Sequence, residues 1–583
     1  MFQRWRLIFR YLPPYRRILG FGIGALVLGN LCQLVAPLFM RDAMRAIEIP
    51  YGAGEPVLYG AVASSASIAL VITLAAGVLF FFKRYLIVGV SRRVEADLRR
   101  DLFRHIQRLP MRFFHRTRTG DLMSRATSDL DSARMAIGPA IMYLVDSLLR
   151  FTGALIIMLS VDAEITLYAL MPLLGIGAGL FFFAPRIQRA ARAVQDQLAA
   201  ISARSQESFA GGRVVKTFAT EDRERAELDA LGRDYLEANV NLSRIRGLTT
   251  SWVVGMGAMA MVLILWVGGQ RVLAGEFDIA SLLLFNSYQV MLIWPMMAFG
   301  WVLAMVQRGA AGVDRIAEVL DCEIESEGAV DASLEGAIEF KKLDFSYDEG
   351  RPVLRDVSVA VPAGTTLGIV GPTGSGKSTF ASLLPRLYDP PRGTVFLDRI
   401  DVLDLPLAAL RRAVAVVPQE AFLFSATIGE NVAFGRPDID PAELDAAVHD
   451  AHLVHDVDAL PDGLDTRVGE RGVTLSGGQK QRAALARAIA ANARVLVLDD
   501  ALSAVDTQTE ATILENLRRV RRGRTVVLIA HRVSALREAD RILYVKNGAI
   551  VESGTHEELL ARDGEYARLA RTQALEAEIE AMQ

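Results

Sequence analysis

Cysteine is nearly absent from this sequence of 583 residues, which contains only Cys32 and Cys322. Cys32 lies in an apolar run and Cys322 beside acidic residues, which excludes a disulfide framework. Charged residues are few, at 22%, whereas hydrophobic residues reach 52%. This balance excludes intrinsic disorder and a collagen-like chain. The positive mean hydropathy of +0.28 predicts a very apolar region joined to an ordinary one, and the length alone allows three or four domains.

Charge of either sign is unevenly distributed along the chain. Residues 1–320 hold 35 Lys and Arg against 25 Asp and Glu, a balance of +10. Residues 321–583 hold 29 against 42, a balance of −13. The acidic second part argues against nucleic acid as a partner, because phosphate binding needs clustered Lys and Arg. The asymmetry predicts that the two parts have different surroundings.

The first part contains six apolar runs that are long enough, or nearly so, to cross a membrane. The runs are Ile18–Met40, Leu58–Phe82, Ile137–Ser160, Ile165–Phe183, Leu248–Val267 and Ile279–Met305. The third run is the weakest, because it contains Asp146 and Arg150. These two residues are four apart and share one helix face, so they can pair with each other. Contact of these charges with a substrate is the alternative.

Basic residues orient the six runs. Lys and Arg are concentrated in three segments: residues 1–17 hold five, residues 83–136 hold 13 and residues 184–247 hold 11. The segment 161–164 holds none, and the segment 268–278 holds only Arg271. The positive-inside rule therefore predicts a multi-pass protein of the cytoplasmic (inner) membrane with both termini in the cytoplasm. The opening run Trp5–Arg10 predicts a short amphipathic helix on the inner surface, ended by the prolines at 13 and 14.

The two long basic segments, residues 83–136 and 184–247, have a helical pattern. If each is a hairpin that continues two spans, arms of about 25 residues reach roughly 37 Å below the bilayer. The tips then fall near Arg116–Leu122 and Gly211–Lys216, where glycines permit sharp turns. We expect these tips to contact another part of the machinery in the cytoplasm.

From about Gly336 the pattern changes to short apolar runs separated by turn residues, which predicts an α/β domain. The run Thr366–Val370 leads into a complete G-x-x-x-x-G-K-[ST] loop. Its glycines let backbone N–H groups close on phosphate oxygens, Lys377 can reach the β and γ phosphates, and Ser378 can ligate Mg²⁺. The predicted nucleotide-binding residues are Gly371, Pro372, Thr373, Gly374, Ser375, Gly376, Lys377, Ser378 and Thr379.

Two further motifs follow in the second part. A second apolar strand, Val495–Leu498, ends in Asp499, a carboxylate that can hold Mg²⁺ opposite the loop. A predicted helix begins at a short polar sequence whose N–H groups and helix dipole form an anion site. Its residues are Ser476, Gly477, Gly478 and Gln479, preceded by Leu475. One phosphate loop and one such site predict a dimer in which each chain completes the other's pocket.

The phosphate loop, the LSGGQ signature and the strand with Asp499, in this order, resemble an ATP-binding cassette of the ABC transporter superfamily. The resemblance implies ATP and Mg²⁺ as ligands, with Ser378, Gln419 and Asp499 on the metal. It also implies adenine stacking by Tyr347, a Q-loop at Gln419, a D-loop at Asp506 and a switch histidine at His531. Residues 466–472 resemble the X-loop of exporters.

The first part resembles the membrane domain of six-span ABC exporters. Gly120–Arg125 with Asp129, and Glu207 with residues 212–218, are similar to the coupling segments of that family. The resemblance implies an α-helical membrane domain with six transmembrane helices over residues 1–320, a linker over 321–335, and an α/β P-loop cassette over 336–583. Importers of the superfamily usually keep these parts on separate chains, so the fusion implies export.

One position departs from the family pattern. Members competent in hydrolysis carry Glu directly after the Asp of the second strand, whereas this chain has Asp500. A carboxylate one methylene shorter stops about 1.5 Å short, which can cost on the order of 10²-fold in rate. We therefore assign Asp500, Gln419 and His531 as catalytic residues of a weakly hydrolytic site. The block at 499–506 resembles the weak-site subunit of heterodimeric multidrug exporters, so we expect a different second half-transporter that has the Glu.

The function implied is ATP-driven export of hydrophobic or amphipathic compounds, small molecules or peptides, by alternating access in contact with membrane lipid. Two alternatives stay open: a homodimeric flippase of lipid or lipid A type, and a mainly regulatory ATP-binding subunit. Soft side chains in the last two spans suit such compounds, although each is as readily a packing residue. These side chains are Trp252, Met256, Met259, Trp266, Phe285, Tyr288, Met291, Trp294, Met297 and Trp301.

Overall fold

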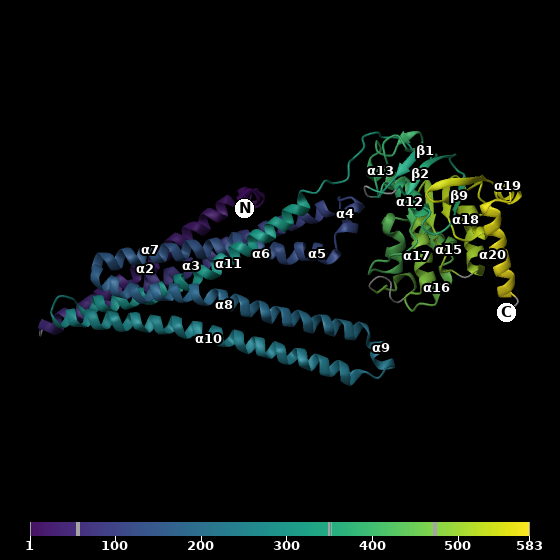
Figure 1. Cartoon of the computed structure of the whole chain (residues 1–583). Helices are drawn as coiled ribbons and strands as arrows, with labels where there is room; N and C mark the ends of the chain where they lie inside the picture. Colours follow the sequence, from purple (N-terminus) through teal and green to yellow (C-terminus); the bar gives the residue numbers. More distant parts are fainter. Residues whose placement is uncertain are drawn as a thin grey trace. The chain divides into compact units, whose positions relative to one another are not determined.

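The computed structural model describes residues 2–53, 59–347, 350, 352–469, 475–505 and 507–581. The chain divides into two compact units, coloured along the sequence in Figure 1. The membrane unit comprises Met1–Gln107 and Thr119–Cys322. The cassette unit comprises Glu323–Gln583 together with Arg108–Arg118, a short piece from the tip of the first predicted hairpin.

Within the described residues, six helical segments are long and apolar enough to cross a membrane. They are Pro13–Pro50, Tyr59–Ile106, Thr119–Val161, Ala163–Ala210, Glu221–Leu273 and Ile279–Leu320. Each contains the described part of one predicted apolar run, which confirms six spans in a multi-pass membrane protein. Leu58, the predicted start of the second run, lies outside the described residues.

The membrane unit is built from long helices whose bounds follow the hydrophobic pattern. Its main helices are α2 (Arg16–Ala53), α3 (Tyr59–Ile106), α7 (Ile141–Val161), α8 (Ala163–Ala210), α10 (Glu221–Leu273) and α11 (Ile279–Leu320). Shorter pieces precede α7 without a break, α5 (Thr119–Ser124), η2 (Arg125–Asp129), α6 (Leu130–Met135) and η3 (Ala136–Ala140). The predicted amphipathic helix is present as α1 (Phe2–Phe9) and ends before a 3₁₀ turn at Pro13–Tyr15.

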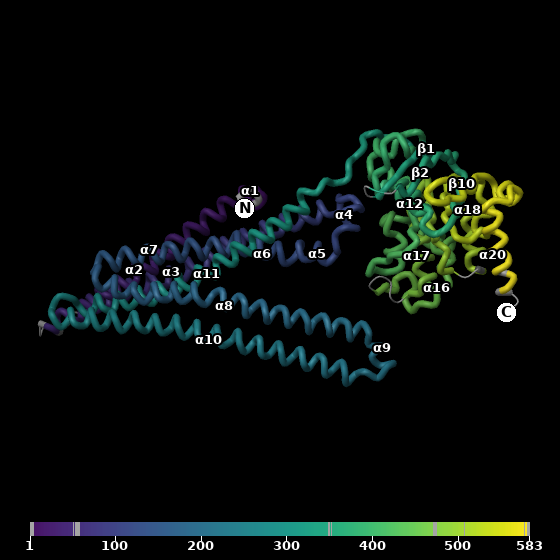
Figure 2. Tube along the Cα trace, viewed as in Figure 1, coloured from purple at the N-terminus to yellow at the C-terminus, as the bar shows by residue number. Residues whose placement is uncertain are grey.

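The two long hairpins predicted to lie in the cytoplasm continue the spans as helices. Helices α8 and α10 run side by side and are joined by α9 (Gly212–Thr217), as Figure 2 shows. The first hairpin turns at α4 (Met111–Arg116), which follows α3. Helix propensity and tertiary packing thus extend each helix well past the apolar run that crosses the bilayer.

A buried polar network links three helices of the membrane unit. Lys83 Nζ on α3 lies 2.5 Å from Asp146 Oδ1 on α7, and both side chains are about 5% exposed or less. Asn30 on α2 donates to the same oxygen at 2.9 Å. Arg150 pairs with Asp146 at 3.2 Å and donates to Asn30 Oδ1 at 2.8 Å. The predicted Asp146–Arg150 pair is therefore part of a larger network with two cations and one carboxylate.

The cassette unit contains two sheets. The six-stranded sheet has the order β10-β9-β3-β8-β7-β6, in which β3, β6, β7, β8 and β9 are parallel and β10 is antiparallel. These strands are β3 (Thr366–Val370), β6 (Val414–Val417), β7 (Val495–Asp499), β8 (Thr525–Ile529), β9 (Arg541–Lys546) and β10 (Ala549–Gly554). Strands β3, β7 and β8 are buried along their whole length, as expected for a parallel sheet covered on both faces.

The second, antiparallel sheet has the order β2-β1-β4-β5. Its strands are β1 (Ile338–Phe345), β2 (Leu354–Val361), β4 (Val395–Leu397) and β5 (Ile400–Asp401). The helices used below are α12 (Lys377–Leu383), α17 (Gly477–Ala490), α18 (Thr507–Val520) and α20 (Glu565–Ala581). Six membrane helices followed by an α/β cassette confirm the predicted fold class.

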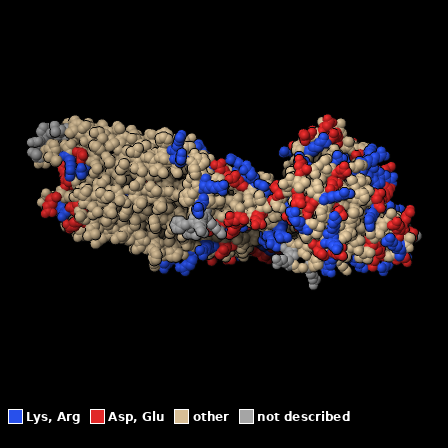
Figure 3. All heavy atoms as spheres, turned by 90° about the horizontal axis from the view of Figure 1, so that it is seen from above, with Lys and Arg blue, Asp and Glu red and all other residues tan. Residues whose placement is uncertain are grey.

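The segment predicted as a linker packs on the cassette. The Arg411 guanidinium holds Glu325 at 2.6 and 2.9 Å, and Arg386, with 1% exposure, donates to Ser326. The Asp398 carboxylate accepts hydrogen bonds from the backbone N–H groups of residues 335–337. Charged side chains cover the visible face of the cassette unit densely but leave a broad stretch of the membrane unit bare, as Figure 3 shows.

Candidate nucleotide-binding site

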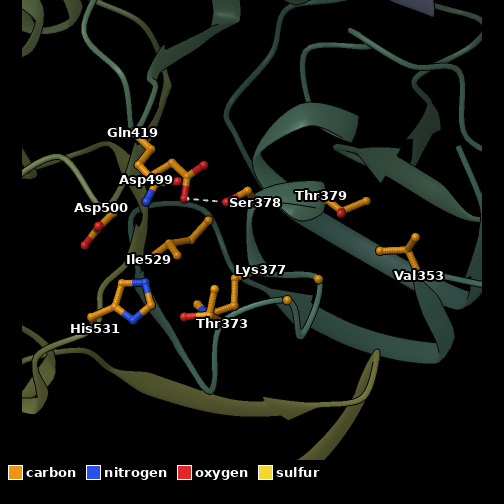
Figure 4. A pocket seen from close by; sticks show the side chains of 12 residues that line it. Val353, Thr373, Lys377, Ser378, Thr379, Gln419, Asp499, Asp500, Ile529 and His531 are labelled. Carbon is orange, nitrogen blue, oxygen red and sulfur yellow. Dashed lines mark hydrogen bonds between the residues drawn. The ribbon is translucent and has the colours of Figure 1, made fainter.

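A cavity of about 250 Å³ opens beside the phosphate loop. Its lining comes from the loop and α12, from the ends of β7 and β8, and from residues just after β6 and β8, as Figure 4 shows. The lining residues are Val353, Thr373, Gly374, Gly376, Lys377, Ser378, Thr379, Gln419, Asp499, Asp500, Ile529 and His531. The structure thus gathers residues from four predicted motifs, up to 158 positions apart (373 to 531), at the carboxyl ends of parallel strands.

The phosphate loop has the backbone that its glycines predict. Gly376 caps α12 with φ of +99°, a left-handed conformation that L side chains rarely adopt. At Gly371 an added Cβ would lie 2.0 Å from the Val545 carbonyl oxygen, so no larger residue fits there. Ser375 Oγ in the same loop is buried and has no hydrogen-bond partner among the residues that the structure describes. A buried hydroxyl without a partner and a helix N-terminus together suit a phosphate group.

Lys377 and Asp499 are both buried at the cavity. Lys377 Nζ donates to the carbonyl oxygens of Gly371 and Pro372, each at 2.8 Å. Burial lowers the pKa of Lys377, and the nearby Asp499 and Asp500 carboxylates oppose that shift. Burial likewise raises the pKa of Asp499, while the hydrogen bond from Ser378 opposes the rise. Both groups are therefore held in a water-poor environment, where added charges interact strongly.

Ser378 and Asp499 offer oxygen ligands side by side. Ser378 Oγ lies 3.1 Å from Asp499 Oδ1, and Gln419 lines the same cavity. A hydroxyl, a carboxylate and an amide oxygen are the donors that Mg²⁺ prefers, and this ion usually uses one or two carboxylates together with phosphate oxygens. The residues present fit Mg²⁺ at this point.

Asp500 directly follows β7 and lines the cavity. Its backbone has φ of +50°, a conformation in which Asp is enriched over most residues. Its N–H donates to the Ile529 carbonyl at 2.9 Å, and its own carbonyl oxygen accepts a hydrogen bond from Ser503 Oγ at 2.9 Å, so the backbone after β7 is held on both sides. His531 lines the same cavity from the loop that follows β8. The three predicted catalytic residues Asp500, His531 and Gln419 therefore lie together.

The signature sequence lies at the start of α17. Ser476 is the N-cap, and it forms a capping box with Gln479, whose backbone N–H donates to Ser476 Oγ at 3.3 Å. Gln479 also donates from its side chain to Asp456 at 3.1 Å. One of the N–H groups predicted for an anion is therefore already capped within the chain. Within the described part of the chain, residues 476–479 do not line the cavity.

Three other predicted features have different outcomes. Tyr347 donates from its hydroxyl to Thr379 Oγ1 at 3.0 Å and packs edge-on against Tyr388, beside the cavity rather than in its lining. Asp506 lies outside the described residues, as do positions 470–472 of the X-loop segment. Val353 and Ile529 line the cavity without having been predicted, because apolar residues in strands or loops carry no motif.

The coupling segments make specific contacts within each unit. In the membrane unit, the Arg315 guanidinium on α11 binds the Asp129 carboxylate through two nitrogens, one of them at 2.7 Å. Arg125 donates to the Arg315 carbonyl at 2.8 Å. In the cassette unit, the ring of His115 on α4 stacks on Tyr388, with centroids 6.0 Å apart. This ring contact lies within the cassette unit, to which residues 108–118 belong.

The soft side chains of the last two spans fall into two groups. Phe285 and Tyr288 are buried, and Met256 and Met291 pack against the same core. Six are at least 41% exposed in this chain, namely Trp252, Met259, Trp266, Trp294, Met297 and Trp301. The second group offers the larger exposed surface for contact with lipid, a second chain or a substrate.

Comparison with known proteins supports this fold and identifies the family. The family model "ABC transporter transmembrane region" matches residues 19–296, and the model "ABC transporter" matches residues 354–503. The chain is 36% identical over 571 residues to the multidrug resistance-like ATP-binding protein MdlA of Escherichia coli (strain K12), which covers 97% of this chain and 96% of that protein.

Two further relatives are informative. An ATP-dependent lipid A-core flippase of Chromohalobacter salexigens is 36% identical over 510 residues, covering 86% of this chain and 88% of that protein. The solved structure of a bacterial Atm1-family ABC exporter with ATP bound superposes with a TM-score of 0.78 at 29% identity, covering 96% of this chain and 98% of that chain. This chain therefore belongs to the ABC transporter family, as an exporter half-transporter in which ATP hydrolysis at one cassette domain is coupled to transport through one six-helix membrane domain.

Proposed function

We propose that this half-transporter exports hydrophobic or amphipathic compounds, drug-like or lipid-like, across the cytoplasmic (inner) membrane with both termini in the cytoplasm. Similarity to relatives named for multidrug resistance and for lipid A flipping supports this substrate class. The six exposed Trp and Met side chains of α10 and α11 supply polarisable apolar surface that tolerates varied ligands. The basic cytoplasmic segments support the orientation.

We assign the predicted cavity residues to ATP and Mg²⁺. Lys377 and the loop N–H groups bind the phosphates, Ser378, Gln419 and Asp499 hold the metal, and Asp500 and His531 face the reacting end. Mg²⁺ neutralises charge on the phosphates. Lys377 is pre-positioned for this role, because its ammonium already lies on the loop carbonyls and has lost most of its water. Tyr347 stacks on the adenine once nucleotide binds.

The signature supports a dimer. Because residues 476–479 lie away from the cavity within the described residues, a second chain supplies the signature that closes over this nucleotide. ATP then joins two cassettes through charge-assisted contacts made only in the closed state, and closure moves the coupling segments. Asp506 of the D-loop belongs to the same dimer face in this proposal.

Asp500 is the observation on which a heterodimer rests. The Asp500 carboxylate lines the cavity, and hydrogen bonds hold the backbone N–H and carbonyl groups of this residue. The backbone therefore cannot shift to bring the short side chain closer to the attacking water. We propose that this site holds ATP and hydrolyses it slowly. The intact signature of this chain then serves a different partner whose own site carries Glu.

The purified full chain in lipid nanodiscs, without a partner, tests the proposal. We expect slow ATP turnover that Asp500→Asn lowers little and that Asp500→Glu raises. Nucleotide trapped with the presumed partner present should be mostly ATP at this chain's site. Brisk turnover by the wild-type chain alone, abolished by Asp500→Asn, would show a homodimer with a competent site and overturn the heterodimer.

A homodimeric lipid flippase is the second candidate, because the lipid A-core flippase is as similar in identity as the multidrug relative. It predicts brisk turnover by the chain alone and translocation of a labelled lipid in vesicles that contain only this chain. The heterodimer predicts neither.

A further inference from the structure

The loop that carries His531 is held from outside the nucleotide cavity. It follows the buried strand β8 and passes directly into the short helix η7 (Val533–Leu536). The His531 side chain faces the cavity, whereas the backbone of the loop contacts the C-terminal helix α20. The position of the histidine therefore depends on these backbone contacts.

One amide group binds both ends of this loop. The backbone N–H of Val533 donates to Gln573 Oε1 at 2.8 Å. Gln573 Nε2 donates to the carbonyl oxygen of His531 at 2.8 Å. The two bonds fix the orientation of the amide, because the reversed orientation would set donor against donor and acceptor against acceptor. No other residue type offers a donor and an acceptor in one plane at this side-chain length.

Helix α20 is firmly attached to the cassette before it reaches Gln573. The Glu552 carboxylate accepts hydrogen bonds from the N–H groups of Glu565 and Tyr566, at 2.6 and 3.2 Å, at the start of the helix. Tyr566 is fully buried, and its hydroxyl lies 2.7 Å from His556 Nδ1. Gln573 follows about two turns later, so the rigid helix start fixes where its amide lies.

A second contact holds Arg532, the residue between His531 and Val533. Arg532 Nη1 lies 2.6 Å from the buried Glu510 Oε2 on α18. Arg532 is not in the lining of the nucleotide cavity, whereas the neighbouring His531 is. The loop is held through its backbone by α20 and through a side chain by α18.

We propose that Gln573 is a positioning residue for His531, and that the C-terminal helix thereby sets the rate of ATP hydrolysis at this site. This inference rests on the proposed role of His531. Gln573 does not line the cavity, so it has no direct contact through which to change ATP binding. Its loss should lower kcat and leave KM for ATP nearly unchanged.

Hydrogen exchange of the full chain in nanodiscs tests the clamp without requiring turnover. Gln573→Leu removes both bonds, and Gln573→Met is a second variant that keeps the unbranched length. We expect the Val533 amide to exchange about fivefold faster or more, with an unchanged rate in the β8 strand. Thr572→Ala is the matched control, since the Thr572 hydroxyl donates to the Arg568 carbonyl of its own helix rather than to the His531 loop. Unchanged exchange at Val533 in both Gln573 variants would overturn the proposal.

A double-mutant cycle in ATP turnover tests the functional link. We expect Gln573→Leu to lower kcat about tenfold, because it displaces His531 from its position in the cavity. We expect His531→Ala to lower kcat further. The double variant should match His531→Ala alone if Gln573 acts through His531. A further drop in the double variant would overturn the positioning role. Turnover that is unaffected by His531→Ala would instead overturn the assigned role of His531. The hydrogen-exchange result would still show whether Gln573 holds the loop.

Discussion

Ser378 Oγ donates a hydrogen bond of 3.1 Å to Asp499 Oδ1, which ties the first helix after the phosphate loop to the end of β7. The carboxylate is 7% exposed, and burial raises its pKa. A single hydroxyl therefore compensates a buried charge only in part. The site is built for a cation that neutralises this carboxylate, and the ligand-free cassette is less stable as a result.

Asp499→Asn should stabilise the ligand-free protein. A folded pKa raised above 3.8 means that the folded state binds the proton more tightly, so at neutral pH ionisation costs stability. We expect the unfolding midpoint of the full chain without nucleotide to rise by about 2–4 °C, equivalent to roughly 1 kcal/mol. Scanning calorimetry or fluorimetry at pH 7 measures it.

The same variant should lose the stabilisation that Mg-ATP confers on the wild-type chain. The advantage of the variant without ligand should shrink as pH falls toward the folded pKa of Asp499, because the wild-type carboxyl is then protonated. A variant less stable than the wild type at pH 7 would contradict this account.

Lys83→Met should destabilise the membrane unit strongly, because it leaves the buried Asp146 carboxylate with less compensation. Breaking one side of a buried pair costs about 3–5 kcal/mol, whereas replacing both charges is far cheaper. We expect Lys83→Met to lower the unfolding midpoint in detergent and the yield of monodisperse protein, and Lys83→Met with Asp146→Asn to recover much of both.

Arg84→Met is the matched control for Lys83. Arg84 is the next residue on the same helix, but its side chain is exposed. We expect this variant to behave like the wild type. An equal loss in both single variants would show that the burial of Lys83 is not what matters.

His115→Ala should reduce the coupling between substrate and ATP turnover. The imidazole ring stacks on Tyr388 of the cassette at 6.0 Å, a contact of about 0.5–1.5 kcal/mol. We expect basal turnover within about twofold of the wild type and loss of most of the stimulation by a transported drug or lipid. Arg112→Ala, an exposed change on the same short helix, should keep the stimulation.

The His556–Tyr566 contact should make the cassette less stable in mild acid. Burial lowers the pKa of His556 below 6.5, helped by Arg537 and opposed by Glu557, so the folded state keeps the ring neutral. Between 6.5 and the lower folded value only the unfolded chain binds the proton, so the free energy of unfolding falls as pH falls. Denaturant unfolding at pH 7.5 and 5.5 should show a smaller drop for His556→Gln than for the wild type. An equal drop would assign the acid sensitivity elsewhere.

The spans and the nucleotide cavity were predictable because their patterns are local. A run of about 20 apolar residues is typical of a membrane span, and a glycine-rich loop before Lys377 is typical of a phosphate site. A parallel sheet brings the carboxyl ends of its strands to one edge, whatever the order of the strands. The strand order itself, with β3 between β8 and β9, leaves no local trace in the sequence.

Lys83 and Gln573 show what a local pattern does not contain. Because Lys83 directly follows Phe82, the sequence pattern predicts only that it marks the cytoplasmic end of a span. Its burial depends on a carboxylate 63 residues away in the sequence. Gln573 precedes a stretch rich in Glu and Ala that is typical of a solvated tail, and its partners are backbone atoms, which every residue has. Interactions with distant or backbone partners need the folded structure.

The Lys83–Asp146 pair also constrains the order in which the protein is made. Asp146 follows Lys83 by 63 residues, so at roughly 5–20 residues per second α3 is complete several seconds before its partner carboxylate exists. Lys83 directly follows the apolar run that ends at Phe82, so its ammonium can stay near the headgroups while α3 inserts. The Lys83–Asp146 pair can form only after α7 has been made. The first three spans therefore reach their final packing together, when the third is complete.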